Sequence, residues 1–177
     1  MSPRRATPLR RACSLTAALA LVACSPDSSR NPLAPTSRVL SAANVALRLH
    51  GTVEMTQTSM QPLGPTTARV QSDGTGTATH LGRFEAISDL TLDFETLRGA
   101  AQWTLIAANG DVLTATTTGR ATPNADGVTL IVVESATITG GTGRFAGATG
   151  SFKIECLSNP ATGVSSGSFD GTITFHK

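Results

Sequence analysis

The sequence of 177 residues is poor in charged and in aromatic side chains, at 15% and 4% of the chain. Four of its 14 basic residues lie within the first 11 positions, in a stretch that we assign below to a targeting segment. Without that stretch, ten basic residues face 12 acidic ones, so the mature chain carries a charge near −2. It has no basic patch that could neutralise a phosphate backbone, which argues against nucleic-acid binding.

Cysteine is scarce as well, and its placement excludes a disulfide framework. Cys13 and Cys24 belong to the N-terminal segment, and Cys156 is the only cysteine in the body of the sequence. A single cysteine there cannot form an intramolecular disulfide within the folded part. The fold must therefore be held by burial and hydrogen bonding.

The common catalytic and metal-binding signatures are also missing. The sequence contains no Gly-x-Ser-x-Gly elbow, His-Glu-x-x-His motif or P-loop. Its three histidines, His50, His80 and His176, lack the i,i+2 or i,i+4 spacing of many metal sites, so we expect them to face solvent or a rim. Cys156 shares the apolar parity of its strand and is predicted to be an inert buried thiol. The sequence thus predicts no catalytic residue, no metal ligand and no cofactor.

The N-terminus has the pattern of a secretory signal. Residues 1–11 carry four arginines and no acid, and residues 12–23 form an apolar run. This run is shorter than the roughly 20 residues that a permanent membrane-spanning helix needs. We therefore predict that residues 1–23 are a signal peptide that is removed from the mature protein.

The end of the apolar run, Leu21-Val22-Ala23-Cys24, resembles the lipobox of bacterial lipoproteins. This resemblance implies cleavage before Cys24, a diacylglyceryl group on its sulfur and a further acyl chain such as palmitate on its amino group. Two or more acyl chains make anchoring stable, so the resemblance implies a lipid-anchored protein of the cell envelope with the membrane as a partner. Ser25 favours the outer membrane if the organism is diderm. The alternative is an ordinary signal peptide in which Cys24 is incidental.

A polar spacer follows the cysteine. Residues 24–43 are dominated by Ser, Pro and Asn and contain too few apolar residues to offset the entropy of ordering. We predict a lipidated flexible tether that lifts the following domain off the membrane. A partner-binding peptide is the alternative interpretation.

The body, residues 44–177, is rich in Thr and Gly, and its apolar residues alternate with polar ones. The alternation is cleanest in residues 151–156 and 168–176, and Leu90, Leu92 and Phe94 alternate with Asp89 and Asp93. A period of two indicates strands with one buried and one wet face, so we expect both aspartates in solvent. The alternative is that they point into a barrel as paired carboxylates with raised pKa, and Glu134 is a further candidate acid before the glycine-rich stretch. No segment has a helical period. About eight strands are expected, which suits an all-β sandwich or barrel.

Three further features bear on how the strands pair. Asn109-Gly110 predicts a hairpin with a type I′ turn that sets Ile106 opposite Leu113, which leaves both faces partly apolar. Asp73-Gly74 and Asp126-Gly127 predict further turns. Residues 128–133 are nearly continuously apolar, which suits either a strand buried on both faces or one that forms an interface.

The most distinctive stretch is rich in glycine. Gly141, Gly143 and Ala146 match part of a dinucleotide-binding fingerprint, but a strand-like segment follows where that fingerprint needs a helix. We interpret the stretch instead as a tight turn at a barrel corner.

The run Gly140-Gly141-Thr142-Gly143-Arg144-Phe145, followed by Ala148 and Gly150, resembles the signature of dirigent proteins and allene oxide cyclase-like barrels. Asn109-Gly110 and Gly119-Arg120 also match the spacing of that family's hairpin. The resemblance covers about residues 100–155, with a looser fit back to about residue 45. It implies an eight-stranded antiparallel β-barrel that is often a homo-oligomer and has an apolar cavity. The matching residues are architectural, and none corresponds to the family's catalytic acids or arginines.

Two functions remain open from the sequence. We favour a non-catalytic barrel, tethered by lipid, that binds a small apolar ligand or a partner. The alternative is an enzyme of the cyclase or dirigent type that acts on a hydrophobic substrate in the barrel lumen. A lumen with convergent polar groups favours ligand binding or catalysis, whereas a lumen filled with Phe, Ile and Leu excludes both.

Overall fold

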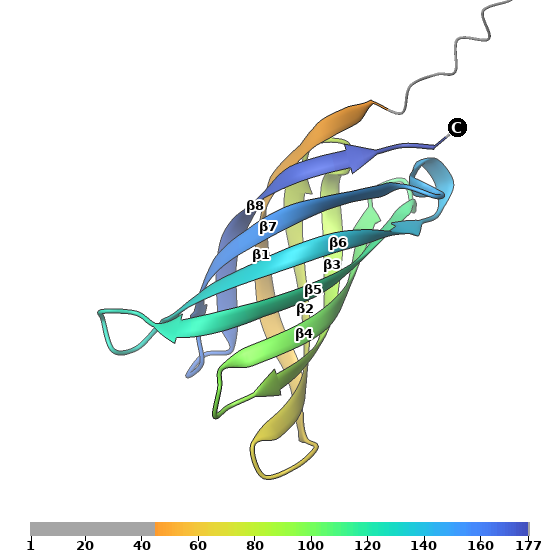
Figure 1. The fold of residues 1–177 in the computed structure, drawn as a ribbon. Helices are drawn as coiled ribbons and strands as arrows, with labels where there is room; N and C mark the ends of the chain where they lie inside the picture. The colour runs from red at the N-terminus through yellow and green to blue at the C-terminus, as the bar shows by residue number, and fades with distance from the viewer. Residues whose placement is uncertain (1–44, 177) are drawn as a thin grey trace, which may run out of the picture. The chain divides into compact units, whose positions relative to one another are not determined.

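The structure is a computed structural model that describes residues 45–176, and these residues form a closed barrel of eight antiparallel strands (Figure 1). The predicted all-β barrel is therefore confirmed. The predicted signal peptide (1–23), the lipidation site Cys24 and the tether (24–43) lie outside the described residues. The strands are β1 (Ala46–Pro62), β2 (Thr67–Ala78), β3 (Gly82–Asp93), β4 (Arg98–Ala107), β5 (Val112–Pro123), β6 (Leu130–Gly141), β7 (Thr149–Asn159) and β8 (Val164–Thr174).

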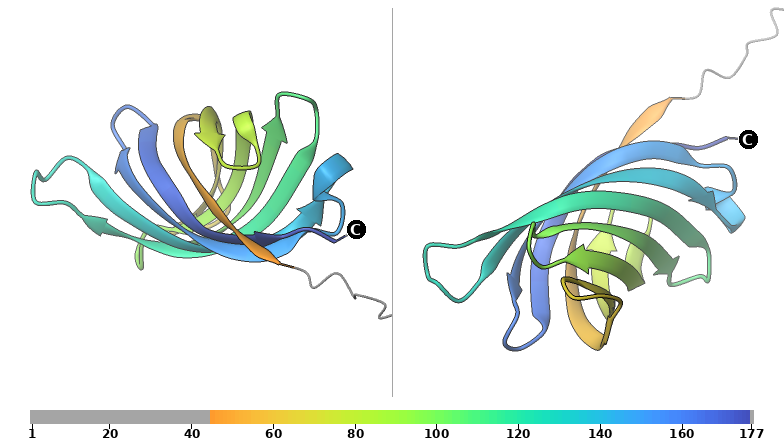
Figure 2. Two further views of the ribbon diagram at one scale, coloured as in Figure 1. Left: turned by 90° about the horizontal axis from the view of Figure 1, so that it is seen from above. Right: turned by 60° about the horizontal axis from the view of Figure 1, so that its bottom comes forward.

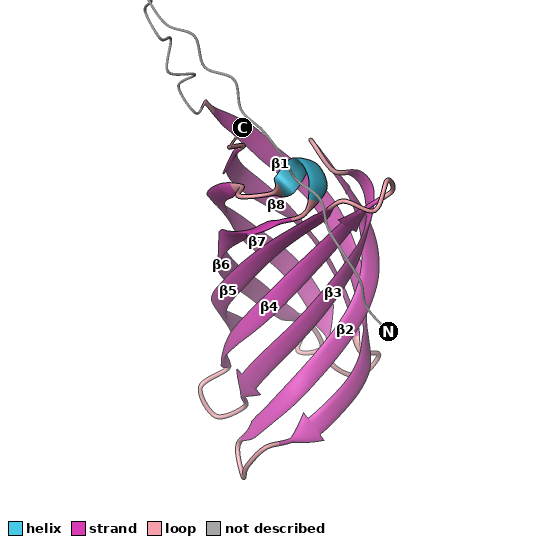
Figure 3. Ribbon diagram, turned by 90° about the vertical axis from the view of Figure 1, so that its right-hand side faces the viewer, coloured by secondary structure: helices cyan, strands magenta, loops and turns pink. Residues whose placement is uncertain are grey.

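Each strand pairs with its neighbours in sequence, and β8 closes the barrel by pairing with β1 (Figures 1 and 3). The register of this closing pair runs from Ala46 opposite Thr174 to Thr56 opposite Val164. Within the described part of the chain, no helix is both long and apolar enough to cross a membrane.

The strands alternate between lumen and solvent as predicted, and one end of the lumen is filled. We call it the closed end, and it is where β1 begins and β8 ends. Figure 2 shows the barrel from above and with its bottom turned toward the viewer. Leu49, Leu113, Phe145 and Ile173 are its fully buried side chains. Inward glycines make room for large neighbours, as where Phe84 of β3 lies flat across Gly76 of β2, leaving no space for a Cβ. An eight-stranded barrel is just wide enough for such packing.

The glycine-rich stretch forms the plug of the closed end. Gly143–Phe145 is a single 3₁₀ turn, η1, and Phe145 inserts with no exposed surface. Gly143 has φ +56°, and a Cβ there would collide with the Asp111 carboxylate. Arg144 stacks on the Phe145 ring, with 5.0 Å between its guanidinium carbon and the ring centroid, and lies 3.5 Å from Asp111. Strand β7 follows this turn, so the dinucleotide interpretation is excluded by the fold.

The β4–β5 hairpin forms at the predicted Asn109-Gly110, but the predicted register is wrong by one residue. Leu105 lies opposite Leu113, and Ile106 lies opposite Val112. Gly110 has φ +85° whereas Asn109 does not have a positive φ, so the loop has three residues and is not a type I′ turn. The shift gives the hairpin one clean inward face with Leu105 and Leu113 both buried.

Two other pairing predictions need correction. Gly74 is not in a turn but lies inside β2, where its backbone passes so close to Met55 of β1 that no side chain fits. Residues 128–133 are not buried on both faces, because Ile131 and Val133 of β6 point outward and are 39% and 37% exposed. Asp126-Gly127 does form the β5–β6 turn, where the Asp126 carboxylate accepts hydrogen bonds from two backbone N–H groups.

Candidate functional site

The half of the lumen opposite the plug is less completely filled than the closed end. Several of its inward-facing side chains are partly exposed, although others in this half, such as Val70, Thr117 and Ala121, are buried like those at the closed end. A side chain on the inner face of a closed sheet reaches solvent through the lumen. We call this region the open half of the lumen. The half-buried side chains that define it are Ser72, Leu90, Leu92, Leu130, Val132, Glu134, Cys156, Ser158 and Ser165.

Glu134 of β6 is the one acid among these inward residues. It shares the inward parity of Ala136 and Ile138, which are both buried. Its neighbour across the strands is Gly119 of β5, where a Cβ would lie 2.6 Å from Glu134 Cγ. The glycine therefore lets the Glu134 side chain lie against the barrel wall.

Glu134 is held in an environment that disfavours its charge. Burial raises the pKa of its carboxyl above the ordinary value, and weaker polar interactions with Thr117 and Trp103 partly offset this rise. Oε2 of Glu134 and Nε1 of Trp103 are both buried, and neither has a partner that meets the distance and angle of a full hydrogen bond, although the Trp103 side chain lies close enough to lower the pKa of Glu134. Most buried polar atoms in proteins are paired, so two unpaired atoms in one lumen are unusual. They provide polar groups that a bound molecule could satisfy.

Cys156 of β7 lies in the same region, and its thiol has low reactivity. It is half-buried on the inner face, next to Gly167 of β8. Burial, together with the nearby Glu134 carboxylate, raises the pKa of its thiol to about 11. The thiolate is the reactive form of cysteine, so this thiol is a poor nucleophile at neutral pH, in agreement with the sequence prediction.

The acids and histidines that the sequence singled out lie elsewhere. Asp89 is on the outer face of β3, where Arg69 Nε donates a 2.7 Å hydrogen bond to it and lowers the pKa of its carboxyl. Asp93 accepts hydrogen bonds from the backbone N–H groups of Glu95 and Thr96 in the β3–β4 turn. Both aspartates therefore belong to the wet face, as predicted. His50, His80 and His176 are exposed.

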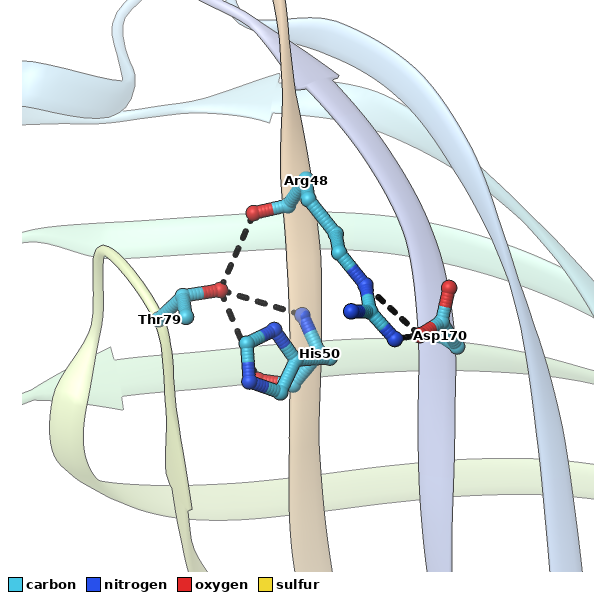
Figure 4. A network of polar contacts seen from close by, with 4 residues as sticks. All are labelled: Arg48, His50, Thr79 and Asp170. Carbon is cyan, nitrogen blue, oxygen red and sulfur yellow. Dashed lines mark hydrogen bonds and ion pairs between the residues drawn. The ribbon is translucent and has the colours of Figure 1, made fainter.

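His50 belongs to a group of four residues that links β1 to β8 and to the β2–β3 turn on the outer surface (Figure 4). The Thr79 hydroxyl accepts a hydrogen bond from the His50 backbone N–H and donates one to the Arg48 carbonyl. Arg48 of β1 in turn forms an ion pair with Asp170 of β8. All four residues are tied to each other at the outer surface, so we interpret the group as structural. Within residues 45–176, no group of three or more His, Cys, Asp or Glu side chains could hold a metal ion.

The outer surface also has a hollow of about 930 Å³ over β8, β1, β2, β3 and β4. Its outward-facing lining side chains include Thr52, Glu54, Thr75 and Glu85, and all four are exposed. Twisted sheets form such saddles as a consequence of their geometry. The hollow contains no unpaired buried group, so the open half of the lumen is the stronger candidate site.

Comparison with solved structures supports the fold. The barrel is similar to two pterocarpan synthase dirigent proteins, GePTS1 at 18% identity with a TM-score of 0.54 and PsPTS1 at 17% identity with a TM-score of 0.57. Each match covers 75% of this chain, and 92% and 97% of the respective dirigent chains. No protein-family model and no curated protein sequence matches the chain. The chain therefore has a dirigent-like eight-stranded β-barrel fold.

Proposed function

We propose that the barrel is a non-catalytic binding module that holds a small, mostly apolar molecule in the open half of its lumen. The observation that carries this proposal is the pair of unpartnered buried atoms, Trp103 Nε1 and Glu134 Oε2. An indole N–H donates a hydrogen bond, and a protonated carboxyl both donates and accepts. A ligand with one hydroxyl or carbonyl group on an apolar body would satisfy these atoms. Pockets of this kind combine apolar walls with a few placed polar groups.

The fluorescence of the single tryptophan can report ligand binding in the lumen. Trp103 is the only tryptophan, the chain has no tyrosine, and its indole is buried in the lumen. We expect the neutral apolar probe N-phenyl-1-naphthylamine to bind in the lumen and to accept excitation energy from Trp103. Titration of the probe with excitation of tryptophan then gives its affinity.

A matched pair of substitutions locates the probe. Ser165 of β8 faces the lumen opposite Met55, whereas Ser166 faces solvent opposite Glu54. Ser165→Phe should fill the open half and weaken probe binding about tenfold or more, while Ser166→Phe should leave the affinity within about twofold. Equal affinities in the two variants would place the probe outside the lumen and overturn the proposal.

A second candidate function rests on burial of the Glu134 carboxyl, which raises its pKa and so favours its protonated form. The alternative is an enzyme of the cyclase or dirigent type in which Glu134 donates that proton to a hydrophobic substrate. If the protein is an enzyme, the Glu134→Gln variant should retain the unreacted substrate, whereas the wild type should contain the product. The molecules extracted from the two proteins would then differ chemically. A binding module would yield the same molecule from both.

We further propose that the barrel is a lipoprotein domain anchored through Cys24 in the cell envelope. The lipobox-like Leu21-Val22-Ala23-Cys24 and the arginine-rich residues before it support this proposal. In a bacterial host, Cys24→Ser should abolish incorporation of labelled fatty acid and either release or stall the precursor. Cys156→Ser is the matched control and should be labelled like the wild type. Unchanged labelling of the Cys24→Ser variant would refute the anchor.

A further inference from the structure

Exposed hydrophobic side chains gather around the mouth of the open half. The four connections at that end, between β1 and β2, β3 and β4, β5 and β6, and β7 and β8, form a rim around the lumen (Figures 1 and 2). Each connection, or the strand end beside it, carries a large apolar side chain that is more than two fifths exposed. These residues, which we call the apolar rim, are Met60 (48%), Leu63 (56%), Phe94 (45%), Val128 (59%), Leu157 (51%) and Val164 (44%).

The distribution of these side chains is uneven along the barrel. At the closed end, the described large hydrophobics with comparable exposure are Val45, just before β1, and Leu47, near its start. Elsewhere, Ile87 (45%), Ile131 (39%) and Val133 (37%) are exposed on the outer faces of β3 and β6. The loops of the closed end instead carry exposed Ala108, Asn109 and Gly110 between β4 and β5, and they bury Leu81 and Phe145. Single exposed hydrophobics are normal, but a ring of them around one opening marks an interaction surface.

The chemistry of the apolar rim fits a lipid surface. The rim spans four separate loops around an opening, so a broad surface contacts all of them at once. The charged side chains in these loops are two acids, Glu95 and Asp126, and the exposed base beside them is Arg98 at the start of β4, so the rim has no excess of positive charge. Attraction to anionic groups is therefore not the main contribution that we expect to docking, and burial of apolar area is. We propose that the apolar rim docks on the apolar–polar interface of a lipid bilayer, with the lumen mouth facing the lipid.

The length of chain before the barrel allows this orientation. Twenty residues separate Cys24 from Val45, and such a segment spans up to roughly 70 Å. β1 has 17 residues, which extend over no more than about 60 Å. A barrel anchored through Cys24 can thus turn its far end to the same bilayer. Docking would connect the proposed ligand site directly to the membrane, so an apolar molecule could enter the lumen without crossing water.

Site-directed fluorescence tests the docking independently of the anchor and of ligand binding. The three natural cysteines of the full chain are first removed by Cys13→Ser, Cys24→Ser and Cys156→Ser. One new cysteine is then introduced in each variant and labelled with the fluorophore bimane, by Gly64→Cys, Ala125→Cys or Ala161→Cys. These three exposed positions lie in three different rim loops. Ala108→Cys, which is exposed at the closed end, is the matched control. The probe is a vesicle of phosphatidylcholine that contains a brominated phosphatidylcholine as quencher.

We expect the three rim labels to be quenched several-fold more than the label at Ala108→Cys, with little dependence on salt. Quenching at Ala108→Cys that equals or exceeds quenching at the rim would overturn the proposal, because contact would then be made through the end at which β1 begins. Absence of quenching at all four positions would also overturn it, as would quenching that requires anionic lipid. These quenching results report lipid contact alone, so they do not depend on whether the lumen binds a ligand.

Discussion

Phe145→Ala should lower the free energy of unfolding by about 3–5 kcal/mol, the largest effect that we expect from a single substitution. The Phe145 side chain has no exposed surface and closes one end of the lumen. Its ring lies 5.9 Å from that of Phe175 and carries the Arg144 guanidinium on its face. Removing the ring opens a cavity that the flanking strands cannot close, because their hydrogen-bonded register fixes their spacing. Urea unfolding followed by circular dichroism measures the change.

Phe94→Ala is the matched control for this prediction. Phe94 is 45% exposed in the β3–β4 connection and lies outside the buried core of the barrel. Its removal should change the free energy of unfolding by about 0.5 kcal/mol or less, as expected for a surface position. Comparable losses in the two variants would show that the plug does not hold the closed end together.

Glu134→Gln should stabilise the protein by an amount that grows with pH. Burial raises the pKa of the Glu134 carboxyl, so in the native state this group keeps a proton that the unfolded chain has already released. Between the unfolded and the native pKa, unfolding therefore releases a proton, and rising pH favours the unfolded chain. The stability that the protonated acid contributes is fully present below the unfolded pKa and is lost as the pH rises through the native one. Glutamine has nearly the same shape and does not titrate.

Urea unfolding at a series of pH values tests this linkage. The Glu134→Gln variant and the wild type should differ least in acid and most at neutral and alkaline pH. Glu155→Gln is the matched control, since Glu155 is exposed on the outer face of the neighbouring strand β7. An advantage of Glu134→Gln over the wild type that stays constant or shrinks as the pH rises would refute the raised pKa of Glu134.

Much of the barrel could be predicted from strand periodicity. The alternation in residues 151–156 and 168–176 correctly placed Phe152, Ile154, Phe169 and Ile173 in the core. Alternation suffices there because one face is apolar and the other is polar. The β4–β5 register failed for a different reason: Asn-Gly occurs in hairpin loops of two and of three residues, and only the backbone conformation of Asn109 distinguishes them.

Glu134 could be named as a candidate acid but not placed in the lumen, because it follows a stretch without visible alternation. Residues 130–133 are all apolar, so they give no sign of which parity points inward. The parity is visible only downstream, in Ala136 and Ile138, and reading it backwards places Glu134 in the lumen. Its environment depends further on Gly119 and Trp103, which lie on other strands. The sequence cannot supply such contacts without the barrel register.

Native mass spectrometry of the protein purified from a bacterial host tests the central claim most directly, since it detects a molecule held in the lumen. We predict that the wild type and the Ser166→Phe variant carry a small molecule that is released on collisional activation, and that the Ser165→Phe variant does not. The same bound mass in the Ser165→Phe variant as in the wild type would contradict a ligand site in the open half of the lumen.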